Sequence, residues 1–181
     1  MHLRPVDSPR AWVVLGHGAG GGVESPDLAG AAQAAGAAGM SVALVEQPYR
    51  VAGRRSPAPA AQLDAAWLVV IEQLELDAPL VAGGRSSGAR VACRTAGETG
   101  ASAVLCLAFP LHPPGKPEKS RLDELDAVTV PTLIVQGEND PFGIAPPGPN
   151  CTVTRIPGTH SLRNSGTVAD AVSEWLTRLG W

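Results

Sequence analysis

Residues 80–90 read LVAGGRSSGAR, and this stretch decides the fold. A short apolar strand pattern at Leu80–Ala82 runs into the pentapeptide Gly-x-Ser-x-Gly at Gly84–Gly88, and a helix pattern follows. Small residues around Ser86 permit a sharp turn from strand to helix, which lifts the serine hydroxyl above the edge of a sheet. The pattern therefore predicts a nucleophile elbow centred on Ser86.

The position of the glycines selects one of two adjacent serines. A frame shifted by one residue would place Arg85 and Ala89 where the glycines belong, so Ser86 fits and Ser87 does not. The N-terminus of the following helix favours negative charge. We therefore expect the backbone amide of Ser87 to donate one hydrogen bond to a developing oxyanion. The structural alternative is an ordinary Gly/Ser turn that caps a helix.

Outward from this turn, strand patterns alternate with helix patterns. Apolar residues recur at three- and four-residue spacing in segments 63–74 and 168–179, as in helices that cover a sheet. Several strand segments are apolar on both faces, as in parallel sheets. The strand patterns are Trp12–Leu15, Ser41–Val45, Leu80–Ala82, Ala103–Ala108, Thr132–Val135 and Thr152–Ile156. We predict one three-layer α/β domain over residues 1–181, with about six mostly parallel strands and a flexible or loosely packed segment at 1–10.

Two loops that follow later strands carry residues able to activate a serine. Asp140 follows the strand pattern at 132–135, and His160 follows the last strand pattern. The carboxyl ends of parallel strands meet at one edge of a sheet, where Ser86 is also expected. A serine nucleophile needs a base and a group that orients the base. We predict Ser86 as nucleophile, His160 as base and Asp140 as the orienting acid.

Each of these residues has an ordinary alternative when it is taken singly. Asp140 precedes a proline and also fits a simple turn, while Glu138 is a competing acid that lies earlier in the same loop. His17 and His112 follow the wrong strands to act as the base, and we expect His17 to buttress its loop. The order Ser, Asp, His along the chain favours the combined assignment.

The first strand pattern runs into a glycine-rich loop at residues 16–22, GHGAGGG. Such a loop can supply a second oxyanion donor, for which the amide of Ala19 is the candidate, with Gly18 as a substrate-binding candidate beside it. The loop also matches a dinucleotide fingerprint, with Glu46 as the ribose ligand. That fingerprint opens a helix within the motif. Here four residues separate the loop from the helix start at Pro26, so the dinucleotide alternative is less favoured.

Four sequence motifs are spread over most of the chain. They are HGAG at 17–20, GGRSSG at 83–88, PLHPPGKP at 110–117 and QGENDPFG at 136–143. With them the chain resembles the small α/β-hydrolases related to dienelactone hydrolases. Within that group it is similar to the branch that includes a subunit of a chromatin-modifying acetyltransferase complex and its short bacterial relatives. The resemblance implies a minimal α/β-hydrolase fold without a lid domain, whose sheet begins at Trp12.

These residues and motifs together predict a serine hydrolase of the carboxylesterase type that needs no cofactor and no metal. The loop at 110–120 is too short for a helical lid, so we expect short or medium carboxylic esters or thioesters as substrates. Dienelactone hydrolases have a cysteine nucleophile where this chain has Ser86, so lactone specificity is not implied. His112 is a further candidate for substrate contact. Arg85 and Arg90 could each hold a substrate carboxylate, and a solvated or ion-paired scaffold role is the alternative for both. The alternative function is a hydrolase fold that serves as a binding or scaffold module.

Composition argues against several other classes of protein. The formal net charge is −3 and there is no basic run, so we expect neither nucleic acid nor a membrane surface as partner. Residues 1–10 carry no signal-peptide pattern, and no apolar run approaches the roughly 20 residues that span a bilayer. Cys93, Cys106 and Cys151 have neither metal-ligand spacing nor the even number of a disulfide framework. We expect a cytoplasmic protein, and the sequence does not indicate its oligomeric state.

Overall fold

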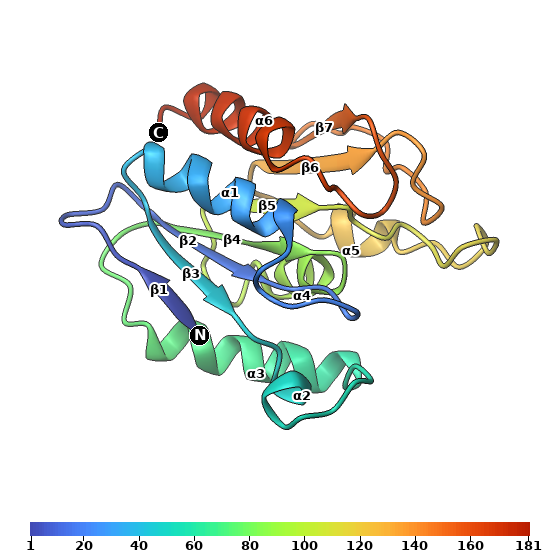
Figure 1. Cartoon of the computed structure of the whole chain (residues 1–181), viewed down its shortest axis with the longest axis horizontal. Coiled ribbons are helices and arrows are strands. Elements are labelled where there is room, and N and C mark those ends of the chain that lie inside the picture. The colour runs from blue at the N-terminus through green and yellow to red at the C-terminus, as the bar shows by residue number, and fades with distance from the viewer.

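Seven strands form one sheet, in the order β1-β3-β2-β4-β5-β6-β7, in the computed structural model, which describes residues 1–181 (Figure 1). The strands are β1 (His2–Arg4), β2 (Trp12–Gly16), β3 (Ser41–Val45), β4 (Leu80–Arg85), β5 (Ala103–Leu107), β6 (Thr132–Gly137) and β7 (Cys151–Ile156). Strands β2 to β7 are parallel, and β1 pairs antiparallel with β3. The predicted mostly parallel sheet is confirmed, with seven strands where the sequence predicted about six.

The edge strand β1 is the one strand that the sequence patterns did not predict. The resemblance implied a sheet that begins at Trp12, which is wrong, because His2–Arg4 pairs with Val42–Leu44 of β3. All three residues of β1 are exposed, so no hydrophobic pattern marks this strand. Backbone pairing with β3 gives the strand its position at the edge of the sheet.

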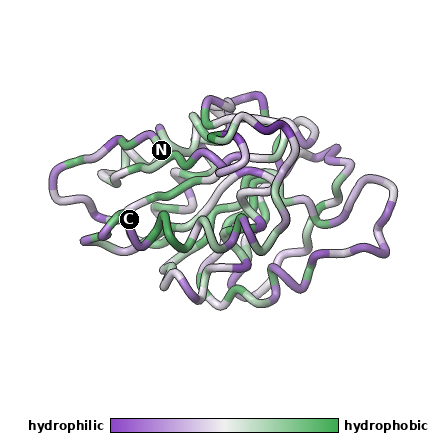
Figure 2. Tube along the Cα trace, turned by 90° about the horizontal axis from the view of Figure 1, so that it is seen from below, coloured by the Kyte–Doolittle hydropathy of each residue, from purple (hydrophilic) through white to green (hydrophobic).

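Helices cover both faces of the sheet. They are α1 (Pro26–Ala37), α2 (Pro48–Val51), α3 (Ala60–Gln73), α4 (Ser87–Thr95), α5 (Leu122–Asp126) and α6 (Ser165–Arg178). Helices α1 and α6 lie together on one face, and α3 and α4 lie on the other (Figure 1). The hydrophobic colour in Figure 2 lies mostly in the interior, whereas the outer loops are largely hydrophilic.

Alternate residues of the central strands enter two separate cores. On β5, Leu105 and Leu107 pack with α1 and α6, while Val104 and Cys106 pack on the side of α3 and α4. A strand between two helical layers is therefore apolar at every position, which explains the continuous apolar run at 103–108. None of the helices has the combination of length and apolar character that a bilayer-spanning helix requires.

The strand order places a topological switch point next to β2. Strand β3 lies on one side of β2 and β4 lies on the other, so the direction of the connections reverses next to β2. In open parallel sheets, ligands bind beside the carboxyl ends of the strands at such a point. The loop between β5 and α5, residues 108–121, contains no helix and forms no lid over this edge.

Candidate active site

The turn after β4 has the strained geometry of a nucleophile elbow. Ser86 adopts φ 51° and ψ −108°, which non-glycine residues rarely adopt, and its amide donates a 2.9 Å hydrogen bond to the carbonyl of Leu107. A Cβ atom at Gly84 or Gly88 would collide with the carbonyl oxygen of Gly16 on β2. The two glycines of the motif therefore let α4 approach the backbone of the neighbouring strand.

The close approach at Gly88 leads to a stability prediction. We expect Gly88→Ala to lower the free energy of unfolding by about 1–3 kcal/mol, because the added methyl group meets backbone that cannot move without shifting β2. The matched control is Gly97→Ala, where an added Cβ meets no atom within 4 Å. Urea unfolding curves of both variants test this. Equal unfolding midpoints for the two variants would contradict the argued contact.

The structure brings the three predicted side chains into one hydrogen-bonded chain. The Ser86 Oγ atom lies 2.9 Å from Nε2 of His160, and Nδ1 of His160 lies 2.8 Å from Oδ2 of Asp140. A buried carboxylate accepts hydrogen bonds, so Nδ1 carries the proton and Nε2 is free to accept from the serine hydroxyl. This arrangement has the order of atoms that general-base activation of a serine requires.

Neighbouring groups hold the acid and the imidazole ring in position. The Asp140 side chain is fully buried, and its carboxylate accepts from Nε2 of Gln136 at 2.6 Å and from the amide of Phe142 at 2.8 Å. The ring of Phe142 packs against the ring of His160, with the centroids 4.1 Å apart. Gln136 and Phe142 were not predicted as site residues, because neither is a catalytic residue type.

Arg85 within the elbow supports the loop that carries His160. Its Nε donates to Oδ2 of the buried Asp27 at 2.8 Å, and its Nη2 donates to the carbonyl of His160 at 3.1 Å. The guanidinium is thus occupied by an ion pair, which was the scaffold alternative for this residue. The structure does not bring Arg85 into the cavity beside Ser86.

Both predicted oxyanion donors line the cavity beside Ser86. The amide of Ala19 donates no hydrogen bond within the protein, while its carbonyl accepts from the Tyr49 hydroxyl at 3.2 Å. Ser87 is the first residue of α4, so its amide has no acceptor within the helix. Two free amides at this position suit a developing negative charge. Their role in catalysis stays a prediction.

Gly18 and His112, the other two candidates for substrate contact, also lie outside this cavity. Gly18 packs against Arg85 and Ser86, leaving no room for a side chain. His112 contacts the carbonyl of Pro113 through Nδ1 and packs against Gly143.

His17 has the buttressing position expected from the sequence. Its Nε2 accepts from the amide of Gln47 at 3.0 Å, and its Nδ1 donates to the carbonyl of Gly18 at 2.7 Å. Burial lowers the pKa of His17, in agreement with a neutral ring that accepts at one nitrogen and donates at the other. The ring therefore holds the loop that carries Ala19.

The cavity beside Ser86 has a volume of about 240 Å³ and combines apolar and basic side chains. Leu63 and Phe142 are among its apolar lining residues. Arg90, Arg94 and Arg121 also line it, and no carboxylate does. The sequence indicated Arg90 only as a general candidate for an anion ligand, and it did not single out the other two arginines.

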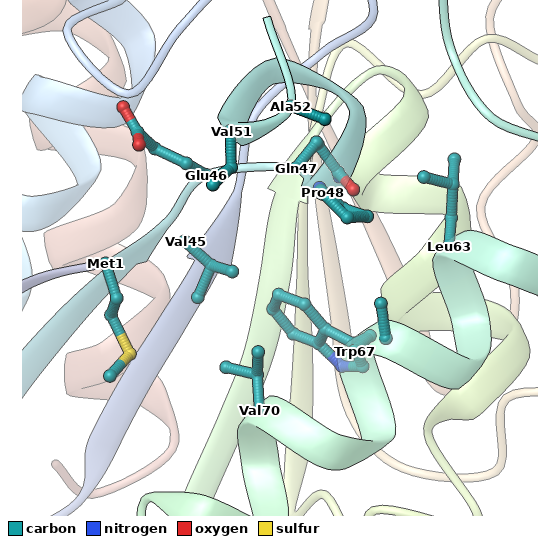
Figure 3. A pocket seen from close by; sticks show the side chains of 11 residues that line it. Met1, Val45, Glu46, Gln47, Pro48, Val51, Ala52, Leu63, Trp67 and Val70 are labelled. Carbon is teal, nitrogen blue, oxygen red and sulfur yellow. The ribbon is translucent and has the colours of Figure 1, made fainter.

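Figure 3 shows a second cavity of about 420 Å³, between β3, α2 and α3. Its lining is mostly apolar and includes Val45, Trp67 and Val70. Glu46 is the only lining residue with an acidic or basic side chain, and none of the three hydrogen-bonded site residues borders this cavity. Because Ser86, His160 and Asp140 all lie outside this cavity, the smaller cavity beside Ser86 is the candidate reaction site.

The structure gives little support to a nucleotide or metal site. The carboxylate of Asp27 lies buried in the first turn of α1, where the dinucleotide alternative would require a pyrophosphate. This carboxylate accepts from the amide of Leu28 and pairs with Arg85, so it already occupies the helix N-terminus that a pyrophosphate would need. No group of three or more His, Cys, Asp or Glu side chains is arranged to bind a metal ion.

Solved structures of several proteins share this fold. XC6422 from Xanthomonas campestris, described as an α/β serine hydrolase without a lid, is 21% identical, with a TM-score of 0.77 over 96% of this chain and 84% of that one. Est1E from Butyrivibrio proteoclasticus is 18% identical, with a TM-score of 0.73 over 95% and 89% of the two chains. The esterase domain of a Rhodothermus marinus protein is 19% identical, with a TM-score of 0.68 over 97% and 91%.

Sequence comparison gives a family match but no individual relative. No curated protein sequence matches the chain significantly. A family model described as an alpha/beta hydrolase domain matches residues 9–152, which include Ser86 and Asp140 and end before His160. This match covers well over half of the chain and agrees with the sheet order and the strand-to-helix turn described above. The chain therefore belongs to the alpha/beta hydrolase domain family.

Proposed function

We propose that the protein is a serine hydrolase that cleaves short or medium carboxylic esters or thioesters through a Ser86-His160-Asp140 triad. The observation that carries the proposal is the chain of contacts from Ser86 Oγ to His160 Nε2 at 2.9 Å and from His160 Nδ1 to Asp140 at 2.8 Å. The small cavity and the absence of a helix over residues 108–121 support a preference for short acyl groups.

The proposed reaction begins when His160 Nε2 takes the hydroxyl proton of Ser86 as Oγ bonds to the substrate carbonyl carbon. The electron pair of the carbonyl moves to its oxygen, and the amides of Ala19 and Ser87 donate hydrogen bonds to this oxyanion. Asp140 stabilises the imidazolium that forms. When the tetrahedral intermediate collapses, His160 gives the proton to the leaving alcohol or thiol, and an acyl-enzyme remains.

Water completes the reaction by the same steps. His160 takes a proton from a water molecule as the water oxygen bonds to the acyl carbon. Collapse of this second intermediate releases the carboxylic acid, and the proton returns to Ser86 Oγ. On the resemblance carried by the motif at residues 110–117, we further propose that the chain belongs to the small lidless branch related to dienelactone hydrolases.

Labelling with a fluorophosphonate tests whether Ser86 is an activated nucleophile. We expect the intact mass to show one stoichiometric adduct on the wild-type protein and none on Ser86→Ala. The matched control Ser102→Ala, which alters an exposed serine away from the site, keeps the adduct. Absence of an adduct on folded wild-type protein would contradict the proposal and favour a binding or scaffold role for the fold.

A further inference from the structure

Three arginines gather on one wall of the cavity beside Ser86, and two of them are already paired. Arg90 donates from Nε to Glu124 at 2.9 Å, and its Nη2 donates to the other oxygen of the same carboxylate. Arg94 donates to both oxygens of Asp64, at 2.8 and 2.6 Å, and lies 3.3 Å from Glu124. These two guanidinium groups are therefore held by bidentate contacts with carboxylates.

Arg121 differs from the other two because it has no carboxylate partner. Its side chain makes one hydrogen bond, from Nη1 to the carbonyl of Pro110 at 2.8 Å, and forms no ion pair. A guanidinium has five N–H donors, so most of those on Arg121 remain available. The residue is half-buried, and its side chain lines the same cavity as Ser86.

The charges of this cluster do not cancel. Three guanidinium groups face two carboxylates, those of Asp64 and Glu124, which leaves one positive charge at the wall. Burial, and then the positive charge of Arg90, lower the pKa of Arg121, so its charged form is disfavoured as long as no anion is near. A guanidinium still stays protonated at neutral pH. An anion that binds here gains both the free donors and the uncompensated charge.

We infer that Arg121 forms a carboxylate-binding subsite beside Ser86, and that the substrates are esters that carry one carboxylate group. This inference rests on the proposed function and names its substrate class. The single unpaired positive charge of the arginine cluster matches a monoanion such as a carboxylate. A phosphate monoester carries more than one negative charge at neutral pH and matches it less well. The cavity of about 240 Å³ suits a small acyl or alcohol group.

Pairs of esters that differ only in charge test the subsite. On the acyl side the pair is monomethyl succinate and methyl succinamate, in which a neutral amide replaces the carboxylate. On the alcohol side the pair is acetoxyacetate and acetoxyacetamide. We expect wild-type protein to prefer the carboxylate in one pair by at least about tenfold in kcat/KM, the size of effect that charge-assisted hydrogen bonds produce.

Variants of Arg121 separate charge recognition from general damage. Arg121→Gln is expected to abolish the preference, so that the two members of the preferred pair are cleaved with equal kcat/KM. Arg121→Lys keeps the charge without the bidentate fork and should restore part of the preference. The control Arg155→Gln alters an exposed arginine on β7 and leaves the preference unchanged. Equal rates on both members of both pairs would overturn the subsite and leave the proposed hydrolase function intact.

A binding experiment tests the subsite independently of turnover. If none of these esters is cleaved, that result counts against the proposed function, and the binding experiment still tests the subsite. Succinamate is a monoanion in which an amide replaces the methyl ester of monomethyl succinate. Calorimetric titration of Ser86→Ala with succinamate measures binding of this carboxylate without turnover. We expect at least about tenfold weaker binding when Arg121→Gln is added to Ser86→Ala. Equal affinity in the two proteins, or no binding to either, would overturn the subsite.

Discussion

Replacement of Ser86 by alanine is expected to lower kcat on a short ester by about 10⁶-fold, the loss seen when the nucleophile of a cooperative triad is removed. The reason is chemical, because the variant keeps His160 and Asp140 but has no atom that can form the acyl-enzyme. The amides of Ala19 and Ser87 remain, so a residual rate above the uncatalysed reaction should persist. Steady-state release of the alcohol measures both rates.

Two further measurements make the Ser86 result interpretable. The unfolding temperature of Ser86→Ala should match wild type, which shows that the loss is not a loss of fold. Adding His160→Ala to Ser86→Ala should cost little more, because the base has no proton to take once the nucleophile is gone. A variant that keeps even one per cent of the wild-type kcat would show that another group attacks the substrate.

Asp140→Asn should lower kcat by about 10⁴-fold, although the variant only replaces one carboxylate oxygen by an NH2 group. In the wild type the Asp140 carboxylate accepts the Nδ1 proton of His160 at 2.8 Å and also accepts from Gln136 at 2.6 Å. An asparagine amide group that replaces Oδ2 donates instead, so the imidazole turns to the tautomer with its proton on Nε2. That proton points at Ser86, and His160 then cannot accept the serine proton.

The neighbouring acid in the same loop provides the control for Asp140. Glu138 lies two residues earlier and is exposed, so Glu138→Gln should keep kcat within about twofold. The sequence left Glu138 as a competing candidate, and the two variants measured together on one short ester decide between them. A larger loss for Glu138→Gln than for Asp140→Asn would contradict the proposed triad.

Much of the site was predictable because the fold brings loops together according to a simple rule. Ser86, Asp140 and His160 each follow the carboxyl end of a strand, and strands of a parallel sheet deliver those ends to one edge. The strands themselves were recognisable because helices cover both faces of the sheet, which makes their sequences apolar throughout. The sequence by itself therefore determined the fold class and the three residues that lie in hydrogen-bond contact.

Other features depended on which side chains meet after folding, and no local pattern marks them. Strand β1 is exposed along its whole length, so only its pairing with β3 reveals it. Arg85 forms its ion pair with Asp27, 58 residues earlier in the chain, and it does not line the cavity beside Ser86. Arg121 is distinctive only because the two carboxylates near it are taken by other arginines. Tertiary structure alone decided these features, because the energy of a charge depends on its partners in space and not on its neighbours in sequence.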